Sequence, residues 1–517
     1  EFMSDLFYTV FYCAGALIMC AVTLLLARRG IHMLQLESYY LRQYVKHMLK
    51  GVLPLLCICG LACLSYAFFN SADIFILPVC IILILPFALK KRQEIKPLKY
   101  TARVKRMLCL YALIILAVCA LCVWRGFYYP IYLLPAFNTA LVFLSALAAK
   151  PLEWGIREGY ILSASRRLKK RPDLKIVGIT GSYGKTSVKF ILSAILKQKY
   201  SVLTPPSSYN TTMGVVRVIR ERLALDDQIF ICEMGARHKG DIKDICRFVH
   251  PDCAIITSIG PQHLETFGSM ERLRDSKFEL IEGLKSGGTA FFPRGNEYAE
   301  QMYERARCEK YYFGFVKDSL ASAEDISSGP QGSEFTLILG GQSVRCHTKL
   351  LGRHNIQNIL AAAACAYKLG LSLEQIERGI CGLEPVEHRL KIIASYPMTV
   401  IDDAFNSSPN GARAALEVLA QFKGRRIIVT PGFVELGPKQ DEYHFQLGCQ
   451  IAESADIAIL VLPERTAEIK RGLLEQGFEP EKIYEARSLK EAAGLLEGIG
   501  LPGDTVLFEN DLPDNYA

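Results

Sequence analysis

A glycine-rich stretch followed by Lys-Thr-Ser is the part of this sequence best suited to chemistry on a phosphate. Residues 177–187 read V-G-I-T-G-S-Y-G-K-T-S, after an apolar run over residues 175–180 and before a predicted helix over residues 187–198. Glycine permits close approach of the backbone, and the N–H groups that open a helix point at an anion. The pattern predicts a nucleotide-phosphate loop made of Gly181, Ser182, Gly184, Lys185, Thr186 and Ser187. Within it, the Lys185 ammonium would lie beside the phosphates and the Thr186 hydroxyl would bind Mg²⁺.

Two further polar residues follow the ends of predicted strands. Residues 228–233 form an apolar strand that ends in Glu233, and His263 follows the strand predicted over residues 253–259. Parallel strands bring their carboxyl ends to one edge of a sheet, so both side chains can lie beside the phosphate loop. We predict that Glu233 binds Mg²⁺ and that His263 is a metal or phosphate ligand. Lys277 comes later, on a predicted helix, where a lone lysine is usually solvated.

The chain around these residues alternates short apolar runs with helical segments, which predicts parallel sheets flanked by helices. The first series has strands at 175–180, 228–233, 253–259 and 289–293. A small antiparallel insert follows, with strands at 311–315, 333–339 and 342–348, and then a helix over 355–369. A second α/β series begins near residue 391, with strands at 398–402, 426–430, 456–461, 482–486 and 505–509.

The first 150 residues differ in composition from the rest. Half of the 517 residues are apolar, and the excess lies in five runs, each read as a membrane span: 5–27, 51–69, 74–89, 107–124 and 127–149. Lysines and arginines gather in the loops 28–50 and 90–106 and after residue 149, whereas the intervening loops hold one arginine. By the positive-inside rule, the N-terminus lies outside the cytoplasmic membrane and the chain after Lys150 lies in the cytoplasm, where ATP is. We therefore predict a multi-pass membrane protein with five spans.

The net charge of +8 comes largely from these membrane-flanking loops, so we expect no nucleic-acid partner. The loop 31–50 mixes tyrosines with basic residues, which is typical of an interfacial amphipathic helix and also compatible with contact to a lipid head group. The 17 cysteines show no zinc-ligand spacing, and we expect small buried side chains in a reduced compartment.

Seven motifs, in one order along the chain, resemble those of the Mur ligases. They read G-S-Y-G-K-T-S, S-Y-N-T-T-M-G-V, E-M-G-A-R-x-x-G-D-I, T-S-I-G-x-x-H-L-E-x-F-G-S, K-F-E, L-G-R-H-N-I-Q-N and D-D-A-F-N-S-S-P. Within that family the chain looks most like the MurF branch, the UDP-N-acetylmuramoyl-tripeptide–D-alanyl-D-alanine ligases. The resemblance covers roughly residues 175–500.

The apolar runs and the resemblance together predict a domain plan. An α-helical transmembrane domain over residues 1–150 and a basic connecting helix over 151–174 precede the ligase. A Mur-ligase P-loop ATPase domain with the small antiparallel insert follows over 175–390, and then a C-terminal Rossmann-like α/β domain over 391–517. The bilayer is therefore an expected partner.

The resemblance also implies roles for single residues. Glu233 and His263 would hold the metal ions, and Lys277 would be carbamylated, which turns a cation into a carboxylate-like metal ligand. The nucleotide would be contacted further by Asn355 and Asn358 beside the adenine, by Arg389 at the γ-phosphate and by Asp403 from the C-terminal domain.

The activity implied is an ATP-dependent amide ligase of peptidoglycan precursor synthesis, with ATP and Mg²⁺ as cofactors. A substrate carboxylate would attack the γ-phosphate, and an amine would then displace phosphate from the acyl phosphate. The carboxyl donor would be a muramoyl peptide, either UDP-linked or undecaprenyl-linked. The amine would be D-Ala-D-Ala or another small amine or dipeptide.

Some segments depart from the MurF pattern. Residues 406–409 read N-S-S-P instead of the usual N-A-N-P. Residues 431–437 read P-G-F-V-E-L-G instead of G-D-M-x-E-L-G. Residues 508–516 read F-E-N-D-L-P-D-N-Y instead of a K-G-S-like end. Predicted membrane spans also replace the UDP-binding domain. Two alternatives therefore stay open: a ligase that amidates or extends a lipid-linked precursor or builds another envelope polymer, and a non-catalytic membrane scaffold.

Overall fold

The computed structural model describes residues 2–36, 97–125, 138–206, 209–262, 264–394, 396–404, 408–434 and 436–510, with residues 39, 41, 44–45, 131, 134–135 and 137. The predicted spans 51–69 and 74–89, the first part of 127–149 and His263 lie outside the described residues or only partly within them. The chain divides into two compact units, Glu1–Gly159 and Tyr160–Ala517.

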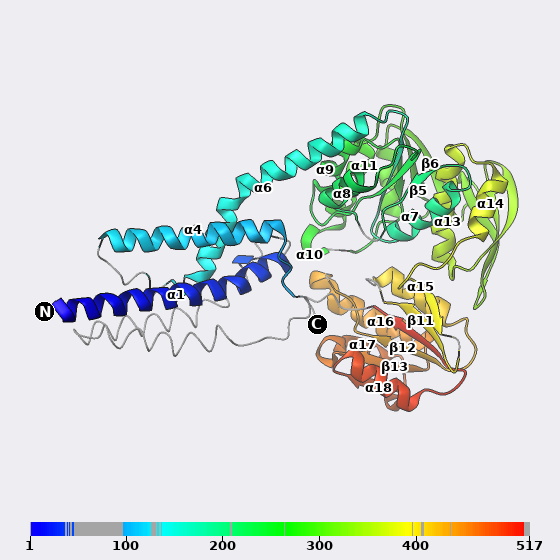
Figure 1. Cartoon of the computed structure of the whole chain (residues 1–517). Helices are drawn as coiled ribbons and strands as arrows, with labels where there is room; N and C mark the ends of the chain where they lie inside the picture. Colours follow the sequence, from blue (N-terminus) through cyan, green and yellow to red (C-terminus); the bar gives the residue numbers. More distant parts are fainter. Residues whose placement is uncertain are drawn as a thin grey trace. The chain divides into compact units, whose positions relative to one another are not determined.

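Three long helices make up most of the described part of the first unit: α1 (Phe2–Leu36), α4 (Ala102–Arg125) and the first part of α6 (Asn138–Lys169) (Figure 1). In the described residues, three helical segments are long and apolar enough to cross a membrane: Leu17–Leu36, Ala102–Arg125 and Asn138–Lys169. They overlap the predicted runs 5–27, 107–124 and 127–149, while the number of five spans stays a prediction.

Polar contacts link α4 to α6 at two levels. The Tyr111 hydroxyl donates to Asn138 Oδ1 at 2.6 Å. Arg106 donates to both carboxylate oxygens of Glu153, at 2.7 and 2.9 Å. Such paired donors and acceptors lower the cost of polar groups in an apolar helix bundle.

α6 joins two segments that the sequence predicts next to each other, the apolar run 127–149 and the basic connecting helix 151–174. In the described residues Asn138–Lys169 is one helix of 32 residues that continues through Pro151. Proline removes one backbone hydrogen bond, but the alanines and leucines around it favour helix strongly enough to continue. From Tyr160 onwards α6 belongs to the second unit, where Ile161, Ala164 and Leu168 pack into the core below the first sheet.

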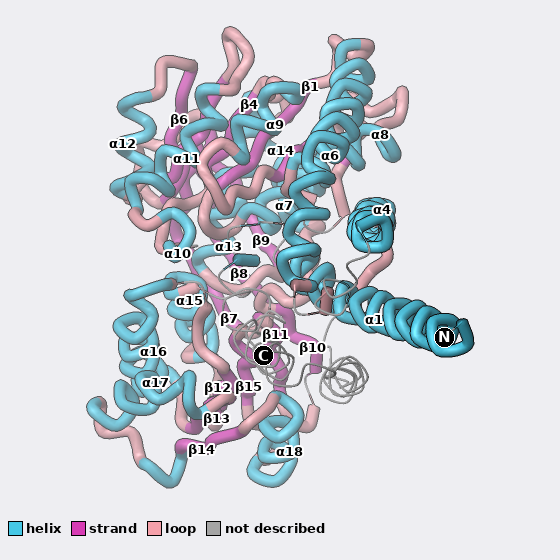
Figure 2. Tube along the Cα trace, turned by 90° about the vertical axis from the view of Figure 1, so that its left-hand side faces the viewer, coloured by secondary structure: helices cyan, strands magenta, loops and turns pink. Residues whose placement is uncertain are grey.

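Within the described residues, nine strands form the first sheet, in the order β2-β3-β1-β4-β5-β6-β7-β8-β9. Strands are drawn in magenta and helices in cyan in Figure 2. Their bounds are β1 Lys175–Thr180, β2 Val202–Leu203, β3 Ile229–Glu233, β4 Cys253–Ile256, β5 Thr289–Pro293, β6 Glu309–Gly314, β7 Ala321–Gly329, β8 Gly332–Leu339 and β9 Gln342–Thr348. From β2 to β7 in this spatial order, which includes β1, each strand is parallel to its neighbour. β8 pairs antiparallel with β7, and β9 pairs antiparallel with β8. The central strands are buried on both faces, as their continuous apolar sequences predict.

Helices cover both faces of this sheet. One face packs against α7 (Lys185–Leu196), α13 (Arg353–Lys368) and α14 (Leu373–Cys381). The other packs against the end of α6 and against α8 (Thr212–Arg222), α9 (Asp241–Val249), α11 (Met270–Glu282) and α12 (Glu297–Arg305). A short helix, α10 (Leu264–Phe267), precedes α11.

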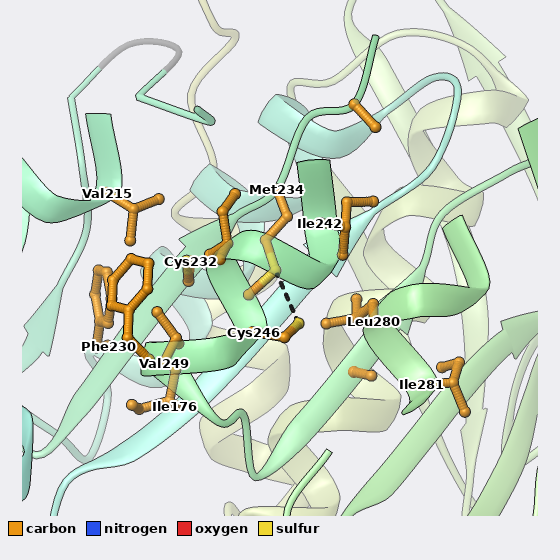
Figure 3. Packing of buried hydrophobic residues seen from close by; sticks show 14 of the residues in the cluster. Ile176, Val215, Phe230, Cys232, Met234, Ile242, Cys246, Val249, Leu280 and Ile281 are labelled. Carbon is orange, nitrogen blue, oxygen red and sulfur yellow. Dashed lines mark hydrogen bonds between the residues drawn. The ribbon is translucent and has the colours of Figure 1, made fainter. Parts of the chain in front are cut away.

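The packing at the end of β3 is shown in Figure 3. The Cys246 thiol lies 3.8 Å from the Met234 sulfur, and Ile242 and Leu280 belong to the same buried cluster. Met234 directly follows Glu233, so this apolar cluster fixes the place where that carboxylate leaves the sheet.

The predicted antiparallel insert is not a separate sheet. β6 pairs in parallel with β5, and β7, which the sequence does not predict, pairs in parallel with β6. β7 reads A-S-A-E-D-I-S-S-G and has no regular apolar alternation, which explains why it is missed. Only β8 and β9 extend the sheet in antiparallel fashion, from that edge.

The second sheet has six strands within the described residues, in the order β10-β11-β15-β12-β13-β14. They are β10 Lys391–Ala394, β11 Thr399–Asp403, β12 Arg426–Thr430, β13 Ile457–Val461, β14 Ile483–Ala486 and β15 Thr505–Glu509. All pairings are parallel except that of β10 with β11. The helices around it are α15 (Pro409–Leu419), α16 (Gln440–Ser454), α17 (Pro463–Glu475) and α18 (Leu489–Ile499), with 3-10 turns at Gly437–Lys439 and Pro480–Lys482.

Candidate active site

β1 runs into α7 through a loop that two glycines make possible. Gly181 has φ 153° and Gly184 has φ 78°, in the region that favours glycine. A Cβ on Gly181 would lie 2.1 Å from Thr257 Oγ1, and one on Gly184 would lie 2.6 Å from Asn358 Oδ1. α7 begins at Lys185, earlier than predicted, and the unpaired N–H groups of its first turn face this loop.

Lys185 folds back into the loop. Its ammonium donates to Gly181 O at 2.7 Å and to Ser182 O at 2.9 Å. Burial and the nearby Arg389 lower the pKa of Lys185 to about 8, against the opposing effect of the Glu233 carboxylate. The buried Ser182 hydroxyl donates to a carbonyl of the segment after β4 at 2.9 Å, which fixes the loop.

Glu233 is the centre of a buried polar cluster at the carboxyl end of β3. Thr186 Oγ1 donates to this carboxylate and lies 3.1 Å from Oε1 and 3.3 Å from Oε2. Asn210 Nδ2 donates to Oε1 at 3.2 Å. Lys189 Nζ lies 3.2 Å from Oε2, and the two charged side chains are 0% and 1% exposed. Lys189 therefore balances the charge of Glu233 inside the protein.

The Thr186 hydroxyl and the Glu233 carboxylate offer the oxygen ligands that Mg²⁺ prefers in proteins. In the described residues, no group of three His, Cys, Asp or Glu side chains could hold a metal ion by itself. Mg²⁺ is usually held in proteins by one or two protein oxygens, substrate phosphates and water.

Lys277 lies on α11 with its side chain fully buried. Burial, and then the neighbouring Lys185, lower the pKa of Lys277 well below its usual value, whereas Asp241 and Glu279 act in the opposite direction. The amine is therefore neutral over a wider pH range than that of a solvated lysine. A neutral amine can act as a nucleophile, which the ammonium cannot.

A pocket lies between α7, α13 and the segment before β10. It is lined by Ser187, Phe190, Ile191, Ala194, Leu350, Asn355, Leu383, Glu384, Val386 and Arg389. Asn355 Nδ2 donates to Leu351 O at 2.9 Å, and Asn358 Nδ2 donates to Asn355 Oδ1 at 3.3 Å. Apolar walls with a few polar groups at the edge suit a flat heterocycle attached to phosphates.

Arg389 reaches this pocket from the linker before β10. The residues on either side, His388 and Leu390, have φ 57° and 45°, which non-glycine residues rarely adopt. Two adjacent carboxylates of β11 hold them. His388 Nδ1 donates to Asp402 Oδ2 at 2.7 Å, and Leu390 N donates to Asp403 Oδ1 at 3.1 Å.

The Arg389 guanidinium lies among acidic groups. Burial lowers its pKa, opposed by Asp403, Glu233 and Glu509 in that order. Burial raises the pKa of Asp403 to about 6, opposed first by Arg389. Asp403 and Glu509 are paired in register at the ends of β11 and β15. Arg389 thus balances carboxylates of both sheets.

The structure therefore brings the predicted site residues together, with the exception of His263, which lies outside the described residues. The roles given to them stay predictions. Sequence reasoning misses Lys189 and Asn210. Lys189 lies one helical turn after Lys185 and so on the same face, which was the available signal. Asn210 stands inside the S-Y-N-T-T-M-G-V motif.

Two models of one family match this chain. Residues 179–366 match the Mur ligase middle domain, and residues 388–509 match the Mur ligase, glutamate ligase domain. UDP-N-acetylmuramoyl-tripeptide–D-alanyl-D-alanine ligase of Bacillus subtilis is 28% identical over 65% of this chain and 72% of its own length. The same enzyme of Escherichia coli is 32% identical over 56% of this chain and 64% of its own length.

Solved structures are similar over the same part. A crystal structure of MurF from Acinetobacter baumannii has 28% identity and a TM-score of 0.63, and covers 69% of this chain and 77% of its own. MurF ligase from Thermotoga maritima in complex with ADP has 25% identity and a TM-score of 0.62, over 69% and 80% of the two chains.

Proposed function

Because the chain belongs to the Mur ligase family of ATP-dependent amide ligases, and is MurF-like within it, we propose that it joins a muramoyl-peptide carboxylate to D-Ala-D-Ala or a similar small amine. The resemblance read from the seven motifs is thereby confirmed for the family. The observation that carries the proposal is the phosphate loop at Lys185 and Thr186, hydrogen-bonded to Glu233 and flanked by Arg389 from the linker.

The chemistry follows in two steps. A carboxylate oxygen of the donor attacks the γ-phosphorus of ATP, the bond to the β-phosphate oxygen breaks, and ADP leaves. The amine nitrogen then attacks the acyl carbon, phosphate leaves, and the amine loses a proton. In both steps Lys185, Arg389 and the N–H groups that open α7 stabilise negative charge on the phosphoryl group. Mg²⁺, held by Thr186 and Glu233, would neutralise further phosphate charge when bound.

The test is a product mass. Purified full-length protein in detergent receives ATP, Mg²⁺, a UDP-linked muramoyl tripeptide and D-Ala-D-Ala. We expect a product heavier than the acceptor by the dipeptide minus one water, with one phosphate released per product. Phosphate release without a coupled product would favour another acceptor or amine. No ATP turnover with any of them would favour the non-catalytic scaffold.

We further propose that the first unit anchors the enzyme in the cytoplasmic membrane with five spans and the N-terminus outside. The support is the set of apolar helical segments at Leu17–Leu36, Ala102–Arg125 and Asn138–Lys169 together with the basic loops predicted inside. Cysteines introduced at Ser71 and Lys99 should be labelled from opposite sides of the membrane. Labelling from one side would overturn the topology.

A second candidate concerns the donor, which could be an undecaprenyl-pyrophosphate-linked muramoyl peptide. Apolar helices stand where the MurF pattern has its UDP-binding domain, and basic loops at a membrane surface attract anionic head groups. Equal amounts of UDP-linked and lipid-linked acceptor should be offered together with ATP and amine. Faster consumption of the UDP-linked form, by the full chain and equally by a chain starting at Tyr160, where the second unit begins, would exclude the lipid-linked donor.

A further inference from the structure

Lys189 is a charged side chain that the proposed chemistry does not use. It lies on α7, one turn after Lys185, with 0% of its side chain exposed. Its ammonium lies 3.2 Å from Glu233 Oε2 and 4.5 Å from the centroid of the Phe190 ring. Burial lowers the pKa of Lys189, whereas the Glu233 carboxylate raises it.

The two oxygens of Glu233 have unequal surroundings. The neutral Thr186 hydroxyl lies at 3.1 Å from Oε1 and 3.3 Å from Oε2, so it does not distinguish them, whereas Oε1 accepts from the neutral Asn210 amide at 3.2 Å. Oε2 faces the Lys189 ammonium. An arriving cation can displace a neutral amide or turn a hydroxyl so that its lone pair points at the metal. It cannot displace the ammonium without leaving a charge buried and uncompensated, which is strongly unfavourable.

We propose that Lys189 sets the metal preference of the site, because it occupies one carboxylate oxygen of Glu233 and leaves the other as a single-oxygen ligand. The inference rests on the proposed function, in which Glu233 and Thr186 bind Mg²⁺. Mg²⁺ demands octahedral geometry and commonly takes one oxygen from a carboxylate, whereas Ca²⁺ accepts carboxylates through both oxygens and takes six to eight ligands. Lys189 therefore disfavours Ca²⁺ and is a positioning residue for the metal ligand.

Two substitutions at this position should act in opposite directions. Lys189→Met keeps an unbranched side chain that is one atom shorter and removes the charge, so both oxygens of Glu233 become available to a metal. Lys189→Arg keeps the charge and can donate to both oxygens at once. The first variant should bind divalent cations more tightly and discriminate less against Ca²⁺, and the second should bind them more weakly.

The experiment measures binding of Mn²⁺ alone to the full-length protein by electron paramagnetic resonance, with Mg²⁺ and Ca²⁺ as competitors. We expect Lys189→Met to raise the affinity for Ca²⁺ relative to Mg²⁺ about tenfold, and Lys189→Arg to lower the affinity for Mn²⁺ about tenfold. Lys310→Met is the matched control, because Lys310 donates to the carbonyls of Tyr303 and Ala306 at the end of α12. It should change neither quantity.

The outcomes separate this inference from the function it rests on. Mn²⁺ binding by the wild-type protein with unchanged competition in both Lys189 variants would overturn the inference alone. Wild-type protein that binds no Mn²⁺, either alone or in the presence of ADP, would overturn the metal site and the inference together. If Lys189→Met does not fold, Lys189→Arg decides: unchanged Mn²⁺ affinity in that variant overturns the inference.

Discussion

The carboxyl edges of the two sheets have the same architecture and different charged groups. At the first edge Lys185 and Lys189 lie beside the Glu233 carboxylate, and the buried Lys277 lies near Lys185 and the carboxylates of Asp241 and Glu279. At the second edge the strands end in Asp402, Asp403 and Glu509, and their partners, His388 and Arg389, come from the linker. The carboxyl edge of a parallel sheet thus provides a binding position, and the side chains at the strand ends determine the charge of the group that can bind there. We expect the first edge to act on phosphates directly and the second to hold Arg389.

The largest effect should come from Lys185 at the first edge. Lys185→Ala removes the cation inside the phosphate loop and should lower ATP-dependent ligation at least about a hundredfold, the usual cost of losing one group that stabilises transition-state charge. Lys175→Ala is the control, because Lys175 lies at the start of β1 and is 59% exposed. Membrane insertion should be unaffected in both variants. Near wild-type turnover of Lys185→Ala would remove the phosphate-site assignment.

Lys277 should come next. Its neutral nitrogen can attack CO₂ and lose a proton, which gives a carbamate and converts a neutral amine at the first edge into an anion. Lys277→Ala should be nearly inactive and partly restored by acetate or formate, which supply the missing carboxylate. Lys285→Ala, at an exposed lysine paired with Asp252, serves as the control. An active alanine variant that small carboxylates do not stimulate would contradict this role.

At the second edge the effect should be smaller. Asp402→Ala removes the partner of His388, so the left-handed backbone around Arg389 loses one of its two supports. We expect about a tenfold loss of kcat, since one supporting hydrogen bond is worth about 1.5 kcal/mol. Binding of ADP, measured by calorimetry, should change little. Asp456→Ala, which breaks an ion pair with Arg426 at the other end of the same sheet, should keep its activity.

The smallest effects concern stability in acid, and the two edges should differ in sign. Burial lowers the pKa of His354, near the first edge, to about 4 from 6.5, so its contribution is full above pH 6.5 and is lost as the pH falls towards 4. The pKa of Asp403 is raised from 3.8 to about 6, so the folded state takes up the proton first and gains stability as the pH falls through 6.

His354→Gln should therefore make the melting temperature less sensitive to acid, and Asp403→Asn more sensitive. Each change amounts to about 1–2 kcal/mol between pH 6.5 and 4.5. Thermal unfolding of the full chain across this range measures both. Parallel shifts in the two variants would show that the edges do not differ in this respect.

How well the sequence predicts a strand depends on whether its own residues carry an apolar pattern. β1, β5, β12 and β15 have the predicted bounds, because buried parallel strands read as continuous apolar runs. The polar β7 is missed because its pairing with β6 and β8 supplies what its own sequence lacks. Tertiary pairing of this kind leaves no local pattern.

The site shows the same division. Gly181, Gly184, Lys185 and Thr186 are found from spacing alone, because the loop that they build is local. Lys189 on α7 is missed, because a lysine on a helix is normally solvated. Its burial depends on an ion pair with Glu233 of β3, which lies far from it in the sequence. The two left-handed residues beside Arg389 also escape prediction, because neither is a glycine and their partners lie on β11.

The linker has a consequence for making chimaeras. Arg389 belongs by contact to the site of the first sheet, yet the backbone that carries it is shaped by Asp402 and Asp403. A junction at Lys391, where the second sheet begins, would take the linker segment that carries Arg389 from one parent and its partners Asp402 and Asp403 from the other. A junction before Val386, whose carbonyl accepts from Arg389 N at 3.2 Å, keeps this linker segment and both carboxylates in one parent. The unit to exchange is therefore the second sheet together with the linker segment that precedes it.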